Sequence, residues 1–106
     1  VPQPWVETAD GTRTRLDDAL GSGWALLRAP GDRTGTDPAW SRAGVRSLTL
    51  LPANSRPAAA AVVDADDVLV PWMRRHRVTT VAVRPDGIVY AAASGSGPLA
   101  PPPFAA

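Results

Sequence analysis

The chain has 106 residues, 44% of them hydrophobic, which is enough for one folded domain with a modest core. Its formal net charge is only +1, so we expect no field-driven attraction to nucleic acid or to a membrane. Cysteine and lysine are both absent, which excludes disulfides, thiol redox chemistry, cysteine-ligated zinc, a Walker-type phosphate loop and a Schiff-base lysine.

The first segments predict a hairpin followed by a short helix. Residues 5–7 and 12–15 flank an Asp10-Gly11 dipeptide, a combination that favours a tight turn between two strands. Residues 16–20 favour one or two helical turns that end at Gly21.

Two further strands are predicted around a second helix. The apolar run 24–27 is typical of a buried central strand, and residues 29–37, rich in Gly, Asp and Thr, are expected to form a loop. Asp37 is predicted to cap a helix over residues 38–43, because a proline suits the first helical position. Residues 45–51 are predicted to form the next strand.

The middle of the chain holds one ambiguous segment and one clear helix. Residues 58–63 contain alanines that favour a helix, yet their two valines favour a short strand, which we prefer. Residues 68–76 carry one apolar stripe with helical spacing, and we expect Asp66 or Asp67 to cap this helix.

A second hairpin is predicted at residues 78–93. Residues 78–84 are rich in β-branched side chains and are apolar on both faces, which indicates an inner strand covered on two sides. The Pro85-Asp86-Gly87 turn then leads into a returning strand over residues 88–93, because proline presets φ and glycine tolerates positive φ.

Both ends of the chain lack a core-forming pattern. We expect residues 1–97 to form the domain and residues 98–106 to be a loose proline-rich tail, with Pro101–Pro103 as an alternative polyproline ligand. The opening Val-Pro-Gln-Pro reads like a linker, which suggests a piece of a longer protein. The sequence has neither a secretory signal nor an apolar run long enough to span a bilayer, so we expect a cytoplasmic location.

Together these elements predict an α/β fold. A strand-helix-strand unit followed by a helix and an antiparallel hairpin is the layout of a thioredoxin-like domain. We therefore expect a central mixed sheet flanked by short helices, without a Cys-x-x-Cys motif.

Three stretches of the sequence carry a family resemblance. They are residues 2–6 (Pro-Gln-Pro-Trp-Val), residues 16–27 (Leu-Asp-Asp-Ala-Leu-Gly-Ser-Gly-Trp-Ala-Leu-Leu) and residues 72–92, which include the Arg-Pro-Asp-Gly turn. Taken together, they resemble the C-terminal domain of the FAD-dependent aromatic hydroxylases. The nearest members are the 3-(3-hydroxyphenyl)propionate hydroxylases, within the group that also contains the phenol and polyketide hydroxylases.

This resemblance implies a thioredoxin-like domain without redox activity. The parent enzyme would use FAD, NAD(P)H and oxygen to hydroxylate a phenolic ring next to an existing hydroxyl. The flavin motifs of the family would lie upstream, so no catalytic, cofactor-binding or metal-binding residue can be assigned within this chain. The domain would pack on the FAD and substrate domains of the same chain and contribute to subunit contacts, commonly in a homodimer.

Few residues could carry chemistry of their own. His76 is the single histidine, and we interpret it as a helix-end residue favoured by the helix dipole rather than as a metal ligand or a triad base. Asp64, Asp66 and Asp67 suggest a calcium site, but the glycine and glutamate of an EF-hand are missing, so capping is preferred.

Two other groups of side chains could serve binding. Arg74, Arg75 and Arg77 are too few to indicate a nucleic-acid site, and we interpret them as a solvated helix end or as a contact with missing domains. The tryptophans are expected mainly in the core, with Trp5 or Trp40 as an alternative interface anchor. The four tryptophans are Trp5, Trp24, Trp40 and Trp72.

Three functions therefore compete. The first is a non-catalytic domain of an aromatic hydroxylase, and the second is a freestanding thioredoxin-like module that binds a protein partner. The third and weakest is a small hydrolase that depends on His76. We also expect the isolated chain to self-associate weakly or not at all in light scattering, because an interface shared with absent domains leaves too little area for a stable dimer.

Overall fold

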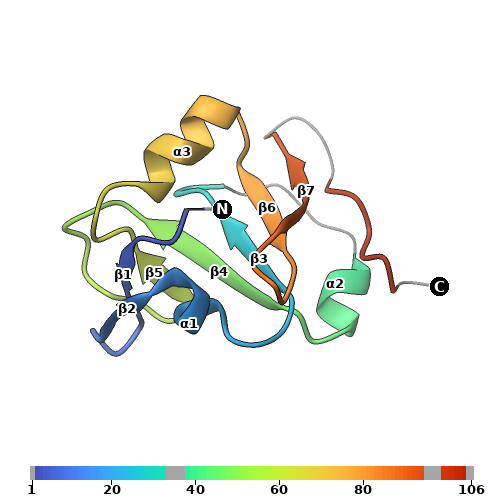
Figure 1. Ribbon diagram of the computed structural model, residues 1–106, viewed down its shortest axis with the longest axis horizontal. Coiled ribbons are helices and arrows are strands. Elements are labelled where there is room, and N and C mark those ends of the chain that lie inside the picture. The colour runs from blue at the N-terminus through green and yellow to red at the C-terminus, as the bar shows by residue number, and fades with distance from the viewer. Residues whose placement is uncertain (1, 33–37, 95–98, 105–106) are drawn as a thin grey trace.

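The computed structural model describes residues 2–32, 38–94 and 99–104. Figure 1 shows the helices and strands of these residues in chain order, from blue to red. They are β1 (Trp5–Glu7), β2 (Arg13–Arg15), α1 (Leu16–Leu20), β3 (Ala25–Arg28), α2 (Pro38–Arg42), β4 (Arg46–Leu51), β5 (Ala61–Val63), α3 (Leu69–His76), β6 (Thr80–Val83) and β7 (Val89–Ala93). Within these ranges, no helix has the length and hydrophobicity that crossing a bilayer requires. The cap predicted at Asp37 lies outside the described residues.

The strands form one mixed seven-stranded sheet in the order β2-β1-β5-β4-β3-β6-β7. Strands β3, β4 and β5 run parallel to one another, and every other neighbouring pair is antiparallel. Both predicted hairpins are confirmed, as β1-β2 and β6-β7. The ambiguous segment is a strand only over Ala61–Val63, and all three of its residues are buried. The predicted central mixed sheet with short helices is therefore confirmed.

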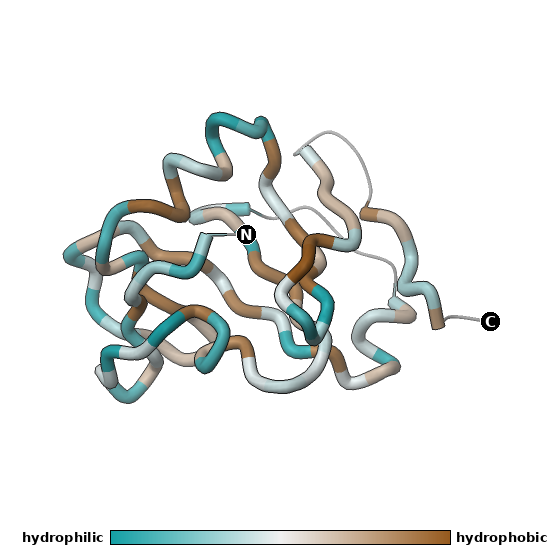
Figure 2. Tube along the Cα trace, in the orientation of Figure 1, coloured by the Kyte–Doolittle hydropathy of each residue, from teal (hydrophilic) through white to brown (hydrophobic). Residues whose placement is uncertain are grey.

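The sheet is covered on both faces. Side chains alternate along a strand, so Val81 and Val83 of β6 join the larger hydrophobic cluster, whereas Ala82 joins a second cluster. Helices α1 and α3 contribute to the larger cluster, and Trp40 of α2 lies in the second. Figure 2 shows the hydrophobic residues along the central strands. The prediction that β6 is an inner strand with apolar residues on both faces is confirmed.

The N-terminus of α3 is capped by a different aspartate from the two that we predicted. The carboxylate of Asp64 accepts the backbone N–H groups of Val68, Leu69 and Val70 at 3.1, 3.0 and 2.9 Å. Asp66 instead accepts the N–H of Trp5, and Asp67 lies in a turn with a φ of 53°. The prediction of Asp66 or Asp67 is wrong because the chain folds back between Asp64 and the helix, which brings the earlier carboxylate beneath three free N–H groups.

The C-terminal segment is packed against the domain, which corrects the expectation of a loose tail without a core-forming pattern. The side chain of Leu99 is only 3% exposed and lies in the second cluster beside Trp40. The indole N–H of Trp40 donates to the carbonyl of Ala100 at 3.0 Å, and the Tyr90 hydroxyl donates to the carbonyl of Pro101 at 3.3 Å. Figure 1 shows this red segment at the end of the molecule that also holds α2 and β7. The boundary of the domain at residue 97 stays a prediction.

Truncation of Leu99 tests this packing. We expect Leu99→Ala to lower the free energy of unfolding by about 2–3 kcal/mol, the usual effect of removing a buried leucine side chain. Urea denaturation followed by tryptophan fluorescence measures the change. Pro103→Ala, at an exposed position of the same segment, is the control and is expected to change the stability by less than about 0.5 kcal/mol. A Leu99→Ala variant as stable as the control would show that the segment does not pack in solution.

Candidate functional site

The cavities on the described surface include three whose linings bear on function. The first, of about 590 Å³, lies between the loop after α1, the end of α2 and Phe104, and Arg46 is its one ionisable lining residue. The second, of about 290 Å³, contains Asp10 and Arg46. The third, of about 310 Å³, lies beside α3 and contains Arg74 and Arg77. The first and third bring no hydroxyl together with a base. In the second, the Thr8 hydroxyl donates to the Asp10 carboxylate, and this contact closes the turn between β1 and β2.

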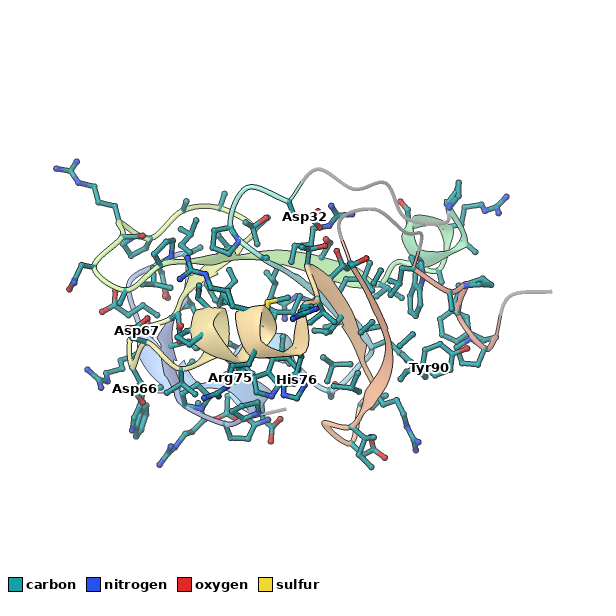
Figure 3. All side chains as sticks on the ribbon, turned by 90° about the horizontal axis from the view of Figure 1, so that it is seen from above. Asp32, Asp66, Asp67, Arg75, His76 and Tyr90 are labelled. Atoms are coloured by element: carbon teal, nitrogen blue, oxygen red, sulfur yellow. The ribbon has the colours of Figure 1, made fainter. Side chains whose placement is uncertain are left out.

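His76 lies exposed at the end of α3, in the position that the sequence predicted. Its ring lies 4.9 Å from that of Trp72, one turn earlier, measured between ring centroids. Figure 3 shows His76 on one side of α3 and Asp32 on the other, so these two do not form a catalytic pair. The geometry fits a helix-end residue packed on an aromatic ring.

The three aspartates between β5 and α3 do not converge on a common point. Asp64 is fully buried and caps α3, while Asp66 also pairs with Arg13, at 3.3 Å between the guanidinium nitrogen and the carboxylate oxygen. No group of three or more His, Asp or Glu side chains in the described ranges is arranged to hold a metal ion. Capping is the observed role of one of them, Asp64.

A part-buried polar contact that sequence reasoning missed joins the segment after β3 to β6. The Thr80 hydroxyl donates to the carboxylate of Asp32 at 2.6 Å, and the guanidinium of Arg28 lies 3.7 Å from the same carboxylate oxygen. Thr80 is almost fully buried at the start of β6, whose other residues are apolar. A threonine in an apolar strand indicates a buried hydroxyl that needs a hydrogen-bond partner. The sequence does not reveal that this partner is Asp32, 48 positions away.

The pKa of Asp10 departs clearly from its usual value. Hydrogen bonds from the Thr8 hydroxyl and from the backbone N–H of Thr12 lower the pKa of Asp10 from 3.8 to about 2. Both donors belong to the turn between β1 and β2, and the carboxyl group is exposed to solvent. Asp10 is therefore a fixed negative charge that closes the turn and is not suited to proton transfer near neutral pH.

The tryptophans divide between core and surface. Trp40 is 1% exposed, which confirms the prediction of core packing for this residue, and Trp24 and Trp72 are partly buried against the two clusters. Trp5 is 37% exposed, so core packing is wrong there. The guanidinium carbon of Arg15 lies 4.4 Å from the Trp5 ring centroid. This cation–π contact holds the exposed Trp5 ring against the surface.

Comparison with known protein families identifies the family to which the chain belongs. Residues 1–98 match the family model described as the HcaD C-terminal domain. The chain belongs to the HcaD C-terminal domain family. The match covers every element of the sheet and all three helices, and it ends just before the packed segment at Leu99.

Curated relatives of this HcaD C-terminal domain are hydroxylases. The 3-(3-hydroxy-phenyl)propionate/3-hydroxycinnamic acid hydroxylase of Burkholderia cenocepacia (strain HI2424) is 34% identical over 112 residues, which cover 92% of this chain and 21% of the relative. The hydroxylase of the same name from Comamonas testosteroni is 32% identical over 109 residues, covering 87% of this chain and 18% of the relative. The predicted resemblance is confirmed, and the chain spans about a fifth of the length of these relatives.

Among solved structures, the HcaD C-terminal domain is similar to yeast Sco1 with copper bound. The TM-score is 0.57 at 15% sequence identity, over 88% of this chain and 80% of that chain. At this identity the likeness shows the fold alone. It confirms the predicted thioredoxin-like architecture, here in a chain without cysteine.

Proposed function

We propose that this chain is a non-catalytic structural domain at the C-terminal end of an FAD- and NAD(P)H-dependent aromatic-ring hydroxylase. The parent enzyme would act in the cytoplasm and add a hydroxyl ortho to the existing hydroxyl of a phenolic substrate. The observation that carries the proposal is the match of 92% of this chain to 21% of a hydroxylase, which supports its being one domain of a larger polypeptide.

The contacts of the ionisable side chains support a structural role. The Asp64 carboxylate is used by the N–H groups of α3, the Asp32 carboxylate by Thr80 and Arg28, and the Asp10 carboxylate by its own turn. His76 packs on Trp72 at the exposed end of a helix. Each of these groups has a contact that stabilises the fold. The hydroxyls beside Asp10 and Asp32 belong to Thr8 and Thr80, which hold a turn and a buried strand in place.

In this proposal the domain packs on the flavin and substrate domains and takes part in subunit contacts. Exposed hydrophobic side chains are available for such contacts, namely Trp5, Ile88, Tyr90 and Phe104. Tryptophan and tyrosine are enriched where protein surfaces meet, so Trp5 is a candidate anchor.

The test is kinetic and uses the full-length hydroxylase. We expect Asp32→Asn and His76→Ala to change kcat per bound flavin by less than about twofold, because neither group would touch the reacting atoms. Arg56→Ala, at an exposed loop position, is the matched control. We also expect the isolated chain to leave FAD fluorescence unchanged in a titration at micromolar concentration.

Two results would contradict the proposal. One is a loss of kcat of about a hundredfold in either variant with its flavin content retained, which would place a catalytic residue in this domain. The other is stoichiometric binding of FAD by the isolated chain. A reading frame that starts at this domain without upstream flavin motifs would instead favour a freestanding module that binds a protein partner.

A further inference from the structure

An apolar pocket with a basic rim lies beside α3. This cavity of about 310 Å³ is bounded by the end of β3, by α3 and by the residues that lead into β6. Val70 and Met73 form a buried part of its wall, and Arg74 and Arg77, both exposed, also line it. We call this feature the α3 pocket. Its apolar wall can accept an apolar side chain, and its guanidinium groups can bind carboxylates.

The arginines at the α3 pocket have no carboxylate partner in the described ranges. Arg13, Arg28 and Arg84 pair with aspartates, whereas the other described arginines form no ion pair within the described ranges. Arg74, Arg75 and Arg77 form no such ion pair within residues 2–32, 38–94 and 99–104. Figure 2 shows this end of α3 as a hydrophilic stretch, and Figure 3 shows Arg75 projecting from the helix. Favourable interaction with the helix dipole accounts for basic residues here, but it does not account for the pocket beside them.

The backbone at Arg77 adds an independent observation. Arg77 ends α3 in the left-handed conformation, with φ 55° and ψ 41°. Gly44 has a positive φ of 72° after α2, and Asn54, Ala60 and Asp67 are the other described non-glycine residues with positive φ. A non-glycine residue is strained in the left-handed conformation, because its Cβ approaches the backbone closely. The chain therefore places a charged side chain at the α3 pocket although a glycine would strain the backbone less.

We propose that the α3 pocket, with Arg74 and Arg77, is the docking site for an acidic segment in another domain of the same hydroxylase polypeptide. An apolar side chain of that segment enters the pocket, and neighbouring carboxylates pair with Arg74 and Arg77. The inference rests on the proposed function and specifies which surface of the domain meets the remainder of the enzyme.

The size of the site favours a segment of the same polypeptide over a second copy of this chain. The chain spans about a fifth of its relatives, so most of such a hydroxylase lies outside it. A tethered segment is present at an effective concentration of the order of millimolar, at which a small pocket and a few charge pairs are sufficient. Stable association of separate subunits through this site alone would require roughly 1,200–2,000 Å² of buried surface.

Hydrogen exchange in the full-length hydroxylase tests the docking. We expect the amides of residues 74–79 to exchange about tenfold more slowly in the full-length enzyme than in the isolated chain. The double variant Arg74→Glu/Arg77→Glu is expected to remove this protection, because carboxylates would then face carboxylates. Arg56→Glu makes the same charge reversal at a remote exposed position and is expected to keep the protection. Equal exchange in the isolated chain and in the full-length enzyme would overturn the proposal.

Cross-linking identifies the occupant, because this chain contains no lysine of its own. Arg77→Lys places an amine at the α3 pocket, and a carbodiimide joins an amine to a carboxylate in direct contact with it. We expect a link to an Asp or Glu upstream of this domain in the same polypeptide, with no such link from the control Arg56→Lys. Mixed isotope-labelled and unlabelled subunits distinguish links within one subunit from links between two.

Each outcome of the cross-linking decides the proposal. A link within one subunit supports it, whereas a link only to a second subunit, or no link above the control, overturns it. If the link forms but Asp32→Asn or His76→Ala abolishes kcat, the docking site stands and the non-catalytic role fails. If kcat is unchanged and no link forms, the proposed function stands and this docking site fails.

Discussion

Trp40→Ala is expected to lower the free energy of unfolding of the isolated chain by about 4 kcal/mol. Trp40 has the largest of the fully buried side chains, and it joins α2 to the second hydrophobic cluster of the sheet. Its removal leaves a cavity between Leu26, Ala82 and Leu99, and it also removes the indole donor to the carbonyl of Ala100. Urea denaturation monitored by far-ultraviolet circular dichroism measures the loss.

A second variant separates packing from hydrogen bonding at this position. Trp40→Phe keeps an aromatic ring in the cluster but removes the N–H, so we expect a smaller loss of about 1–2 kcal/mol. Trp40→Ala should also expose residues 99–104 to proteolysis, because Leu99 and Phe104 pack against this ring. Equal losses for the alanine and phenylalanine variants would show that the hydrogen bond to the C-terminal segment, and not the packing, is the main contribution.

Asp64→Ala is expected to destabilise the chain by about 3 kcal/mol. The Asp64 carboxylate is fully buried and accepts three backbone N–H groups at the start of α3, two of which belong to buried residues. Loss of a helix cap costs about 0.5–2 kcal/mol, and leaving buried donors without an acceptor adds to this loss. Chemical denaturation of the variant and the unchanged chain at neutral pH gives the difference.

Two further substitutions make this prediction specific. Asp64→Asn keeps one acceptor oxygen and is expected to lose about half as much stability as Asp64→Ala. Asp18→Ala removes an exposed carboxylate from the first turn of α1 and is expected to cost less than about 1 kcal/mol. An Asp64→Ala variant no less stable than Asp18→Ala would mean that water replaces the carboxylate at the end of α3.

Local sequence signals were sufficient for most of the secondary structure. The Pro85-Asp86-Gly87 turn, with its glycine at φ 84°, and the β-branched run before it determine a hairpin through steric preferences of adjacent residues. The family was also readable from contiguous stretches, because the match to the HcaD C-terminal domain covers residues 1–98. The sequence also showed the run of arginines at the end of α3, but it gave no indication of the pocket beside them.

The contacts that the sequence left open join residues that are far apart along the chain or that lie on the two sides of a turn. Asp32 meets Thr80, Leu99 meets Trp40, and Asp64 caps α3 from the far side of a turn. An isolated leucine among prolines has no periodicity, and an aspartate in a loop offers no clue to its partner. The sequence by itself determined the elements, since these depend on neighbours within a few residues. Only the tertiary structure decided which polar groups are paired in the core and where the surface is hollowed, because packing brings those groups together after the elements have formed.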